Sequence, residues 1–431
     1  KRFQKFHSDL SFIKKRITES LGDLYGMHWP FKQHKTSRNV KTLPYHDELK
    51  SFGACFGVSG GYERPMWFAL DGEKTEYEYS YNYQNWYPSA EYETNNTVKN
   101  VGLFDLTPFS KFEIKSDKAH KELQKICTAN IKNEVGKCIY THMLNPDGGI
   151  ETDLTVVCIE KDHFRIISSA ATRERDKFHI KKYLAKDIEL KDVTDDFCVF
   201  GVFGPKSRAL MKSISKDDFE NDEFRFGTAK YISIEGIKIW TQRLSYVGEL
   251  GFELYVRSKD AKKIYELLID KGKDFNLSNC GMHAMDIMRM ESGFLHWGHD
   301  ISPEENQYQA GLSFTISSKK EDEFIGKRAL EKIKKEKIKS RFAMFTLKDS
   351  KPGEPLLLHD EPIYLENNII GRSTSGNYSF NFKKNLAFGY INNDISNDEL
   401  HKKDLFIEVE KKKYPIEIII KPLKQTNFKN N

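Results

Sequence analysis

The sequence predicts an α+β protein that ends in a small all-β domain, and three observations lead to this prediction. Helix-like and strand-like segments alternate between about residues 96 and 339. Six short segments rich in apolar and β-branched residues follow at close spacing in 340–425, which is typical of a small antiparallel barrel or sandwich. A chain of 431 residues has room for roughly three domains. We therefore expect three parts, at residues 1–95, 96–339 and 340–431.

The first part is predicted to begin with a helix and to continue as loops and short strands. Apolar residues recur at helical spacing in FHSDLSFIKKRITESLGDLYGMHW, and Ser8 or Asp9 is placed to cap this helix. Four glycines and one proline in GACFGVSGGYERPMWFA favour loop and short strand. The alternating tyrosines of residues 76–83 indicate a further strand.

The second part alternates strands with amphipathic helices. Strands are expected at residues 101–106, 111–116, 139–145, 150–170, 198–205 and 231–256, with a turn at the Pro-Asp-Gly-Gly sequence and further turns at 235–236 and 248–251. Helices are expected at residues 117–128, 171–186, 206–214, 261–271 and 284–293, and a Lys/Glu-rich helix at 326–339 leads to the β-rich third part.

Charge and composition exclude several classes of partner. The 68 Lys and Arg residues against 63 Asp and Glu give a net charge of +5 that is spread along the whole chain, so we expect no nucleic-acid partner. There is no apolar stretch of 18 residues, so no membrane partner is expected. The 6 cysteines lie far apart without a CxxC pair, which argues against a disulfide scaffold or a structural metal site and favours a reducing compartment.

Without a GxGxxG, Walker A, HExxH or GxSxG motif, chemistry must come from less stereotyped features, and two acids stand out. Asp153 follows a Gly-Gly turn and shares one strand face with Thr155 and Val157. A carboxylate among β-branched residues is costly unless it is paired or used, although an edge strand would leave it solvated. Glu253 lies between Phe252 and Leu254, where it can accept two N–H groups of a ligand; the alternative is an exposed turn acid, as for Glu249.

Two further segments carry charged or metal-ligating residue types. His296, His299 and Asp300 follow the helix at 284–293, either as metal ligands or, more commonly for such a loop, as caps of their own turn. Asp286, Arg289 and Glu291 are most simply a charge set on the surface of that helix. Arg64 is held extended by Pro65 and can stack on Trp67 or bind an anion, or simply pack. We expect no metal.

Seven segments resemble, in the same order, the folate-binding aminomethyltransferase family. This family comprises the T-protein of the glycine cleavage system and the C-terminal halves of dimethylglycine and sarcosine dehydrogenases and oxidases. The segments are VGLFDLTPFSKFEI, YTHMLNPDGGIETDLTVV, FGVFGPKSRALM, SYVGELGFELYV, MDIMRMESGFLHWGHDI, FIGKRAL and GRSTSGNYSFNFKKNLAFGYI. SYVGELGFELY and HWGHDI look closer to the dehydrogenase branch. Within residues 1–95, ITESLGDLYGMHWPF, LPYHDELKSFGACFG and GYERPMWFA look like the end of a flavin-dependent half.

The resemblance assigns roles to five residues. The family's essential aspartate falls on Asp153, its two folate-contacting tyrosines on Tyr140 and Tyr246, and its pterin-binding glutamate on Glu253. Arg289 lies in the helix that often supplies an arginine near the site, although the family's ARD variant has its arginine where this chain has Met285.

The resemblance also implies an aminomethyltransferase fold with a C-terminal β-barrel, and a reaction. Oxidation of an N-methylated amine yields an iminium ion, whose methylene carbon passes to tetrahydrofolate to give 5,10-methylenetetrahydrofolate. The dinucleotide fold that precedes this segment in the family is absent, so we expect FAD to belong to a flavin half in cis that this sequence lacks; the start at Lys1, not methionine, agrees with this expectation. A cytoplasmic location is expected, or the mitochondrial matrix in a eukaryote.

Two other functions stay open. A stand-alone aminomethyltransferase would start near residue 96, and the segment Met27–Phe68 argues against it. A non-catalytic folate-binding protein would lack the carboxylate in the Gly-Gly strand, and Asp153 argues against it.

Overall fold

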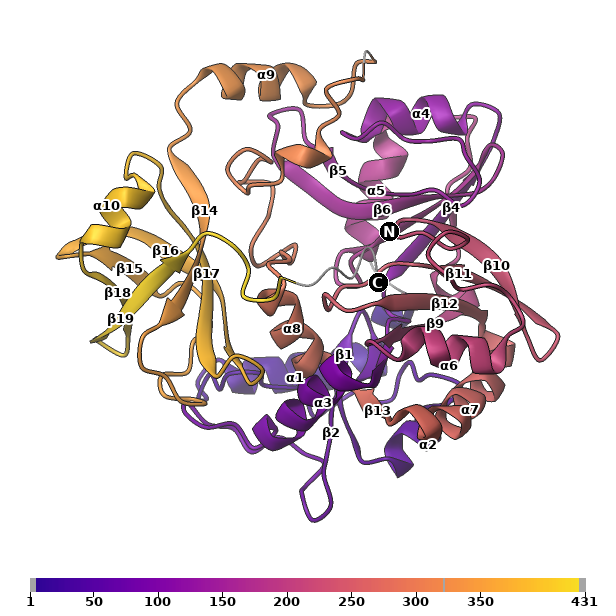
Figure 1. Cartoon of the computed structure of the whole chain (residues 1–431), viewed down its shortest axis with the longest axis horizontal. Coiled ribbons are helices and arrows are strands. Elements are labelled where there is room, and N and C mark those ends of the chain that lie inside the picture. Colours follow the sequence, from indigo (N-terminus) through magenta and orange to yellow (C-terminus); the bar gives the residue numbers. More distant parts are fainter. Residues whose placement is uncertain (1–4, 321, 426–431) are drawn as a thin grey trace.

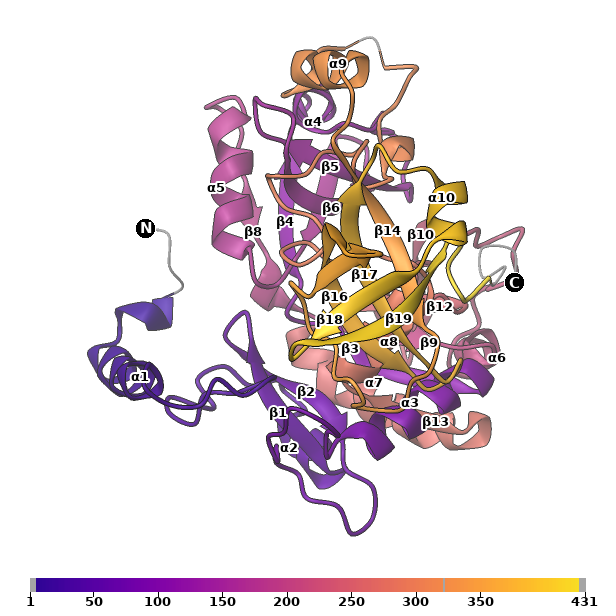
Figure 2. The ribbon, with the colours of Figure 1, turned by 90° about the vertical axis from the view of Figure 1, so that its left-hand side faces the viewer.

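The computed structural model describes residues 5–320 and 322–425 and has three lobes arranged around helix α8 (Met282–Glu291) (Figure 1). Two of the lobes are built on β-sheets and the third is a closed barrel. The α+β class and the C-terminal barrel predicted from the sequence are confirmed. The N-terminal segment of residues 5–68, here called the leader, lies at the side of the molecule and carries helix α1 away from the lobes (Figure 2).

Helix α1 (Leu10–Asp23) is the predicted first helix, and Asp9 caps it. The Asp9 side chain accepts hydrogen bonds from the backbone N–H groups of Ser11 (2.7 Å) and Phe12 (3.3 Å), which satisfies two of the free donors at the helix start. None of the residues of α1 is buried. One face of the helix is an exposed apolar stripe made of Leu10, Ile17, Leu21 and Leu24.

The segment after α1 contains α2 (His46–Ser51) and a hairpin of β1 (Ala54–Ser59) and β2 (Tyr62–Phe68). The strand predicted at residues 76–83 is wrong, because the structure has no strand there. Tyr77 instead packs edge-on against Trp67 with ring centroids 4.5 Å apart, and its hydroxyl group forms a 2.9 Å hydrogen bond with His283. The tyrosines are held by ring contacts, without a partner strand.

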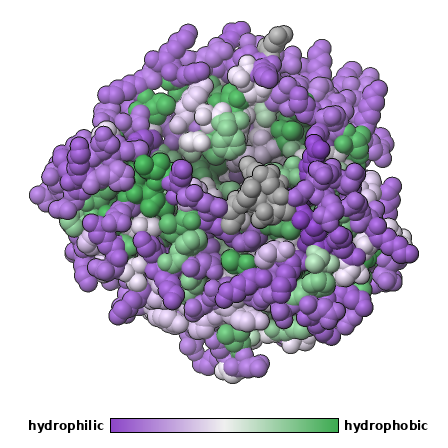
Figure 3. Space-filling view, viewed as in Figure 1, coloured by the Kyte–Doolittle hydropathy of each residue, from purple (hydrophilic) through white to green (hydrophobic). Residues whose placement is uncertain are grey.

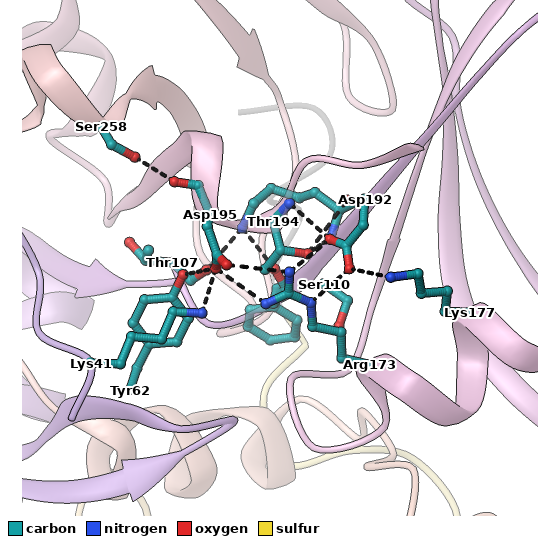
Figure 4. Close-up of polar contacts among 12 residues, drawn as sticks. Lys41, Tyr62, Thr107, Ser110, Arg173, Lys177, Asp192, Thr194, Asp195 and Ser258 are labelled. Atoms are coloured by element: carbon teal, nitrogen blue, oxygen red, sulfur yellow. Dashed lines mark hydrogen bonds and ion pairs between the residues drawn. The ribbon is translucent and has the colours of Figure 1, made fainter. Parts of the chain in front are cut away.

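A polar network centred on Asp195 joins the leader to helix α5 (Arg173–Tyr183) (Figure 4). The Asp195 carboxylate accepts hydrogen bonds from the ammonium group of Lys41, from the hydroxyl group of Tyr62 (2.5 Å) and from the guanidinium group of Arg173 (3.1 Å). Arg173 also donates to Asp192 (3.0 Å). These donors hold the pKa of Asp195 well below its usual value, despite partial burial.

The first lobe is a six-stranded sheet with the order β10–β11–β12–β9–β3–β13, antiparallel except for the β3–β13 pair. Its strands are β3 (Val101–Asp105), β9 (Phe197–Phe203), β10 (Ala229–Ile234), β11 (Ile237–Gln242), β12 (Gly251–Arg257) and β13 (Leu277–Cys280). The second lobe is an antiparallel sheet with the order β5–β6–β7–β4–β8. Its strands are β4 (Ser110–Lys115), β5 (Cys138–Leu144), β6 (Ile150–Glu160), β7 (His163–Ser168) and β8 (Lys191–Asp192).

Each sheet buries one face under helices and turns the other toward its neighbour. Helices α6 (Ser207–Ile214) and α7 (Ala261–Gly272) cover the first sheet, and α4 (Ala119–Ile126) and α5 (Arg173–Tyr183) cover the second. The inner faces share a third core, which contains Val157 of β6, Trp240 of β11 and Met288 of α8. Helix α3 (Tyr87–Lys99), which the sequence did not indicate, packs against α8.

The third lobe is a closed antiparallel barrel with the strand order β14–β17–β16–β15–β18–β19. Closure pairs the first strand with the last, so the barrel has no free edge. The Lys/Glu-rich helix α9 (Lys327–Lys335) precedes it, and α10 (Asn397–Lys402) lies between its fourth and fifth strands in sequence. The strands are β14 (Ser340–Leu347), β15 (Pro362–Leu365), β16 (Asn368–Ser379), β17 (Lys384–Asn392), β18 (Leu405–Val409) and β19 (Lys412–Ile419).

All 6 cysteines are buried and unpaired. Burial raises the pKa of the Cys55, Cys127 and Cys198 thiols to about 12. Within the described ranges, no helix has the length and apolar character needed to cross a bilayer.

Candidate functional site

Asp153, the acid predicted to be catalytic, is positioned by the hairpin of β5 and β6. Its turn depends on two glycines: Gly148 has a φ of +89°, and a Cβ atom on Gly149 would lie 1.9 Å from the carbonyl oxygen of Pro303. The register that follows sets Asp153 directly opposite His142 and Thr155 opposite Tyr140. Because directly opposed residues of an antiparallel pair share a face, Tyr140, His142 and Asp153 all lie on the inner face of the second sheet.

Asp153 is largely enclosed and incompletely hydrogen bonded. Strand β6 lies between β5 and β7, so the alternative of a solvated edge strand is wrong. The side chain keeps 19% of its surface exposed, and its Oδ1 atom has no hydrogen-bond partner among residues 5–320 and 322–425. Burial raises the pKa of Asp153 to about 7, against the lowering effect of a hydrogen bond with Tyr140, while the charge of Asp176 raises it further. A carboxyl group with a pKa of about 7 is suited to take up and release a proton at neutral pH.

The two predicted folate-contacting tyrosines lie near Asp153. The Tyr140 hydroxyl group is 3.3 Å from the Nε2 atom of His142, and 39% of the Tyr140 surface is exposed. The Tyr246 hydroxyl group donates to the carbonyl oxygen of Leu295 (2.9 Å), and its ring stacks on Phe294 with centroids 6.0 Å apart. The charge of Asp153 raises the pKa of both tyrosines, after the larger effect of burial. The structure therefore brings Tyr140, Asp153 and Tyr246 together.

Glu253 lies on the inner face of the first sheet. The Tyr255 hydroxyl group donates to its Oε2 atom (3.1 Å), and burial raises its pKa to about 7. Glu253 also raises the pKa of Cys138, at the start of β5. Cys138 and His142 are four residues apart on one strand, or about 13 Å. Glu253, beside Cys138, and Asp153, opposite His142, thus mark the two ends of a strip along β5. Their spacing suits a long flat ligand.

The first sheet contributes a residue that the sequence did not indicate. Gln242 of β11 lies directly opposite Glu253, so both side chains share the inner face. Gln242 is fully buried, and within the part of the chain that the structure describes neither polar atom of its amide group has a hydrogen-bond partner. A buried unpaired amide is costly and needs a partner such as a ligand or an ordered water. The signal in the sequence was weak, because Gln242 ends a strand that also contains Lys238 and Thr241.

Arg289 is buried in α8 and has four partners. Its guanidinium group donates to Asp286 (2.8 Å), Asp300 (2.6 Å), the carbonyl oxygen of Phe294 (3.1 Å) and Ser375 of the barrel (2.9 Å). These two acids raise its pKa, in spite of burial. The expected surface charge set is therefore wrong: Arg289 joins α8 to the following loop and to β16. Glu291, also buried, accepts from Ser379 and Asn381 of the barrel.

The other candidates form ordinary structural contacts. Both carboxylate oxygens of Asp300 are bound by Arg289, Thr374, Ser375 and the backbone of His296, so this loop is tied to the barrel. Among residues 5–320 and 322–425, the three-residue group with metal-like spacing is Glu19, Asp23 and His34 of the leader. There Glu19 already accepts from Lys35 and Thr36.

Arg64 and Glu249 are both internal. Arg64 donates to the carbonyl oxygen of Asp105 (2.7 Å) and lies over the ring of Phe109. Burial lowers its pKa to about 10. Glu249, which the exposed-turn alternative places in solvent, is buried and paired with Lys424.

The inner faces, α8 and the barrel surround the middle of the molecule. In Figure 3 the rim of this side is hydrophilic, and pale and apolar residues lie recessed toward its middle. The arrangement offers two acids that titrate near neutral pH, an unpaired amide and two tyrosine rings along one strip. It suits an extended ligand that carries both hydrogen-bonding groups and flat rings.

Comparison with known families gives three matches along the chain. The GCVT N-terminal domain matches residues 45–320, and the glycine cleavage T-protein C-terminal barrel domain matches residues 341–424. The FAD dependent oxidoreductase central domain matches residues 1–42.

Similar proteins include both long and short relatives. The chain is 35% identical to a 4-methylaminobutanoate oxidase (formaldehyde-forming) of Paenarthrobacter nicotinovorans over 98% of this chain and 50% of the relative. It is 33% identical to the mitochondrial dimethylglycine dehydrogenase of Rattus norvegicus over 96% of this chain and 48% of the relative. An aminomethyltransferase of Alkaliphilus metalliredigens is 30% identical over 77% of this chain and 88% of the relative. The chain thus spans about half the length of the oxidase and of the dehydrogenase.

A solved structure has the same fold. The glycine cleavage system aminomethyltransferase T from Bartonella henselae superimposes with a TM-score of 0.75 at 21% identity, over 89% of this chain and 98% of that chain. The aminomethyltransferase fold is confirmed. Since the GCVT match covers more than half of the chain and the barrel match follows it, the chain belongs to the glycine cleavage T-protein family, among relatives of the dimethylglycine and sarcosine dehydrogenase type.

Proposed function

We propose that the chain transfers the methylene carbon of an iminium ion to tetrahydrofolate and so forms 5,10-methylenetetrahydrofolate. The observation that supports this most is Asp153: an incompletely bonded carboxyl group, with a pKa near 7, on the inner face beside Tyr140 and Tyr246. Such a group exchanges protons with a bound ligand at neutral pH.

In the proposed reaction, N5 of tetrahydrofolate attacks the iminium carbon and forms a C–N bond. N10 then attacks the same carbon, and the bond to the departing amine breaks. The two nitrogens lose one proton each, and the amine leaves as an ammonium ion, so charge and atoms balance. Asp153 takes a proton from a folate nitrogen and passes it to the amine, and its charged form stabilises the cation.

The strip along β5 provides the binding groups. Glu253 and Gln242 offer acceptors and a donor to the N–H and carbonyl edge of the pterin. Tyr140 and Tyr246 supply flat walls between this end and Asp153. Arg289, with its four protein partners, acts near the folate mainly by holding the loop that carries Leu295, the acceptor of the Tyr246 hydroxyl group.

We assign the oxidation step to a flavin half joined to this chain. Within the chain we propose three domains, at residues 1–95, 96–339 and 340–431. The match of residues 1–42 to an FAD dependent oxidoreductase domain and the apolar stripe of α1 support a flavin domain packed on the leader. Mitochondrial relatives support the matrix as the location in a eukaryote. The name of the formaldehyde-forming relative supports a second outcome, release of the carbon as formaldehyde.

The test joins the chain to the flavin half of a dimethylglycine dehydrogenase and supplies dimethylglycine and tetrahydrofolate. Asp153→Asn and Asp153→Ala should abolish 5,10-methylenetetrahydrofolate formation and divert the carbon to formaldehyde, while folate binding stays within about tenfold, or about 1.4 kcal/mol. Asp147→Asn, in the exposed turn of the same hairpin, is the matched control. Undiminished transfer by Asp153→Asn would disprove the role of Asp153.

A further inference from the structure

His142 connects Asp153 to a residue far away in the sequence. Its Nε2 atom lies 3.8 Å from Oδ1 of Asp153 and 3.3 Å from the Tyr140 hydroxyl group. On the other side of the ring, its Nδ1 atom lies 3.0 Å from the hydroxyl oxygen of Thr315. Thr315 belongs to the short 3-10 turn Ser313–Thr315, which contacts β5, and both His142 and Thr315 are buried.

Counting protons determines the tautomer of His142. The Thr315 hydroxyl group donates its single proton to the carbonyl oxygen of Leu312, at 2.7 Å. With that proton on Leu312, the Thr315 oxygen accepts in the contact with His142, and we assign the ring proton to Nδ1 on this basis. A neutral imidazole then carries a lone pair on Nε2. Burial lowers the pKa of His142 to about 3, which keeps the ring neutral.

The lone pair on Nε2 faces the carboxyl oxygen that lacks a partner. An ionised Oδ1 atom has no proton to offer this lone pair, whereas a protonated Asp153 donates to it after a small side-chain rotation. We propose that His142, held in its Nδ1-protonated tautomer by Thr315, is a positioning residue that presents a hydrogen-bond acceptor to Asp153 and favours the protonated carboxyl group. Its part in catalysis rests on the transfer reaction proposed above.

The other titratable groups around Asp153 do not remove this preference. Tyr140 has a single proton, which it gives either to His142 or to Asp153. Asp176, on α5, favours the protonated form of Asp153 when it is ionised, although burial raises the pKa of Asp176 itself to about 7. Tyr246 is neutral because burial raises its pKa. Asp176 itself accepts from the hydroxyl groups of Ser168 (2.7 Å) and Thr172 (2.6 Å).

The first test reads the tautomer directly in the full chain without folate. The chain is labelled with ¹⁵N-histidine, and the His142 signals are assigned by their loss in His142→Asn. We expect a non-titrating ring that is protonated at Nδ1. Thr315→Val keeps the branched shape but removes the acceptor, so it should shift His142 to the Nε2-protonated form; Thr315→Ser keeps the hydroxyl group and should not. An Nε2-protonated ring in the unchanged chain would disprove the proposal, even where Thr315→Val fails to fold.

The second test follows the ¹³C carboxyl signal of Asp153, assigned with Asp153→Asn. In Thr315→Val the ring donates to the carboxylate, so the titration midpoint of Asp153 should fall by about one pH unit, because a hydrogen bond to the charged form favours it. Thr315→Ser should match the unchanged chain. An identical midpoint in Thr315→Val, with only a lower melting temperature, would show a merely structural role. Since both tests are done without folate, they stand apart from a failure of the proposed transfer reaction.

Discussion

Glu253 and Gln242 lie opposite each other on neighbouring strands, and substitution of either should weaken ligand binding. Glu253→Ala should weaken tetrahydrofolate binding by about 2 kcal/mol or more, because a charged hydrogen-bonding partner is lost. Gln242→Leu should weaken binding too, yet raise the melting temperature of the ligand-free chain, because it removes two unpaired buried atoms. Tryptophan fluorescence quenching measures the binding.

The control for this pair is Glu235→Gln, at the exposed tip of the β10–β11 hairpin, which should change neither quantity. An unchanged dissociation constant in Glu253→Ala would remove Glu253 from the binding site. A lower melting temperature for Gln242→Leu would mean that ordered water already satisfies the amide.

The raised pKa of Asp153 should also appear in the pH dependence of stability. Its pKa is about 7 in the folded chain against the ordinary value of 3.8, so the folded state binds the proton more tightly. The contribution of this proton is complete below about pH 4 and is lost as the pH rises to about 7. Asp153→Asn should therefore gain stability over the unchanged chain by about 1 to 4 kcal/mol between pH 4 and pH 8, in urea unfolding. A constant difference would contradict the raised pKa.

At the scale of elements, Arg289 determines how α8 holds the barrel. Arg289→Met leaves the Asp300 side chain, which is fully buried, without its cation, and this should cost about 3 to 5 kcal/mol of unfolding free energy. Asp300→Asn in the same chain should recover part of the loss, since it removes the unpaired charge. Hydrogen exchange should rise first in β16, which carries Ser375. Equal protection of β16 in Arg289→Met and in the unchanged chain would contradict this coupling between α8 and the barrel.

Most elements follow from local patterns in the sequence, and those that were missed involve distant partners. The strands of both sheets and of the barrel show the apolar alternation or buried runs that predict them. The tyrosines of 76–83 show the same alternation, but no strand lies beside them; Trp67 and His283 take their rings. The charges of α8 have helix-surface spacing, yet polar groups from the barrel surround them.

The site was predictable to a similar degree. Asp153, Tyr140 and Tyr246 could be named from motifs of the family, and the structure brings them together. His142 and Gln242 were not named, because their importance depends on cross-strand register and on missing hydrogen-bond partners. Neither property is local in sequence.

For the whole molecule, the apolar stripe of α1 gives a test of how the two reactions are joined. In the chain fused to a flavin half, Ile17→Glu should loosen the packing of that half on the leader, so that more of the carbon escapes as formaldehyde. Thr18→Glu adds the same charge to a different face of α1 and should leave the product ratio unchanged. Equal ratios in both variants would show that the stripe is not covered by the flavin half.

The six buried thiols have a practical consequence for that experiment. A thiol reacts with maleimides as its thiolate, and burial and raised pKa values leave these six largely protonated and out of reach. A cysteine introduced at Tyr25, which is 97% exposed at the end of α1, should then take up a single fluorophore or spin label. The native chain thus needs no cysteine removal before the surroundings of the leader are followed in solution with this single label.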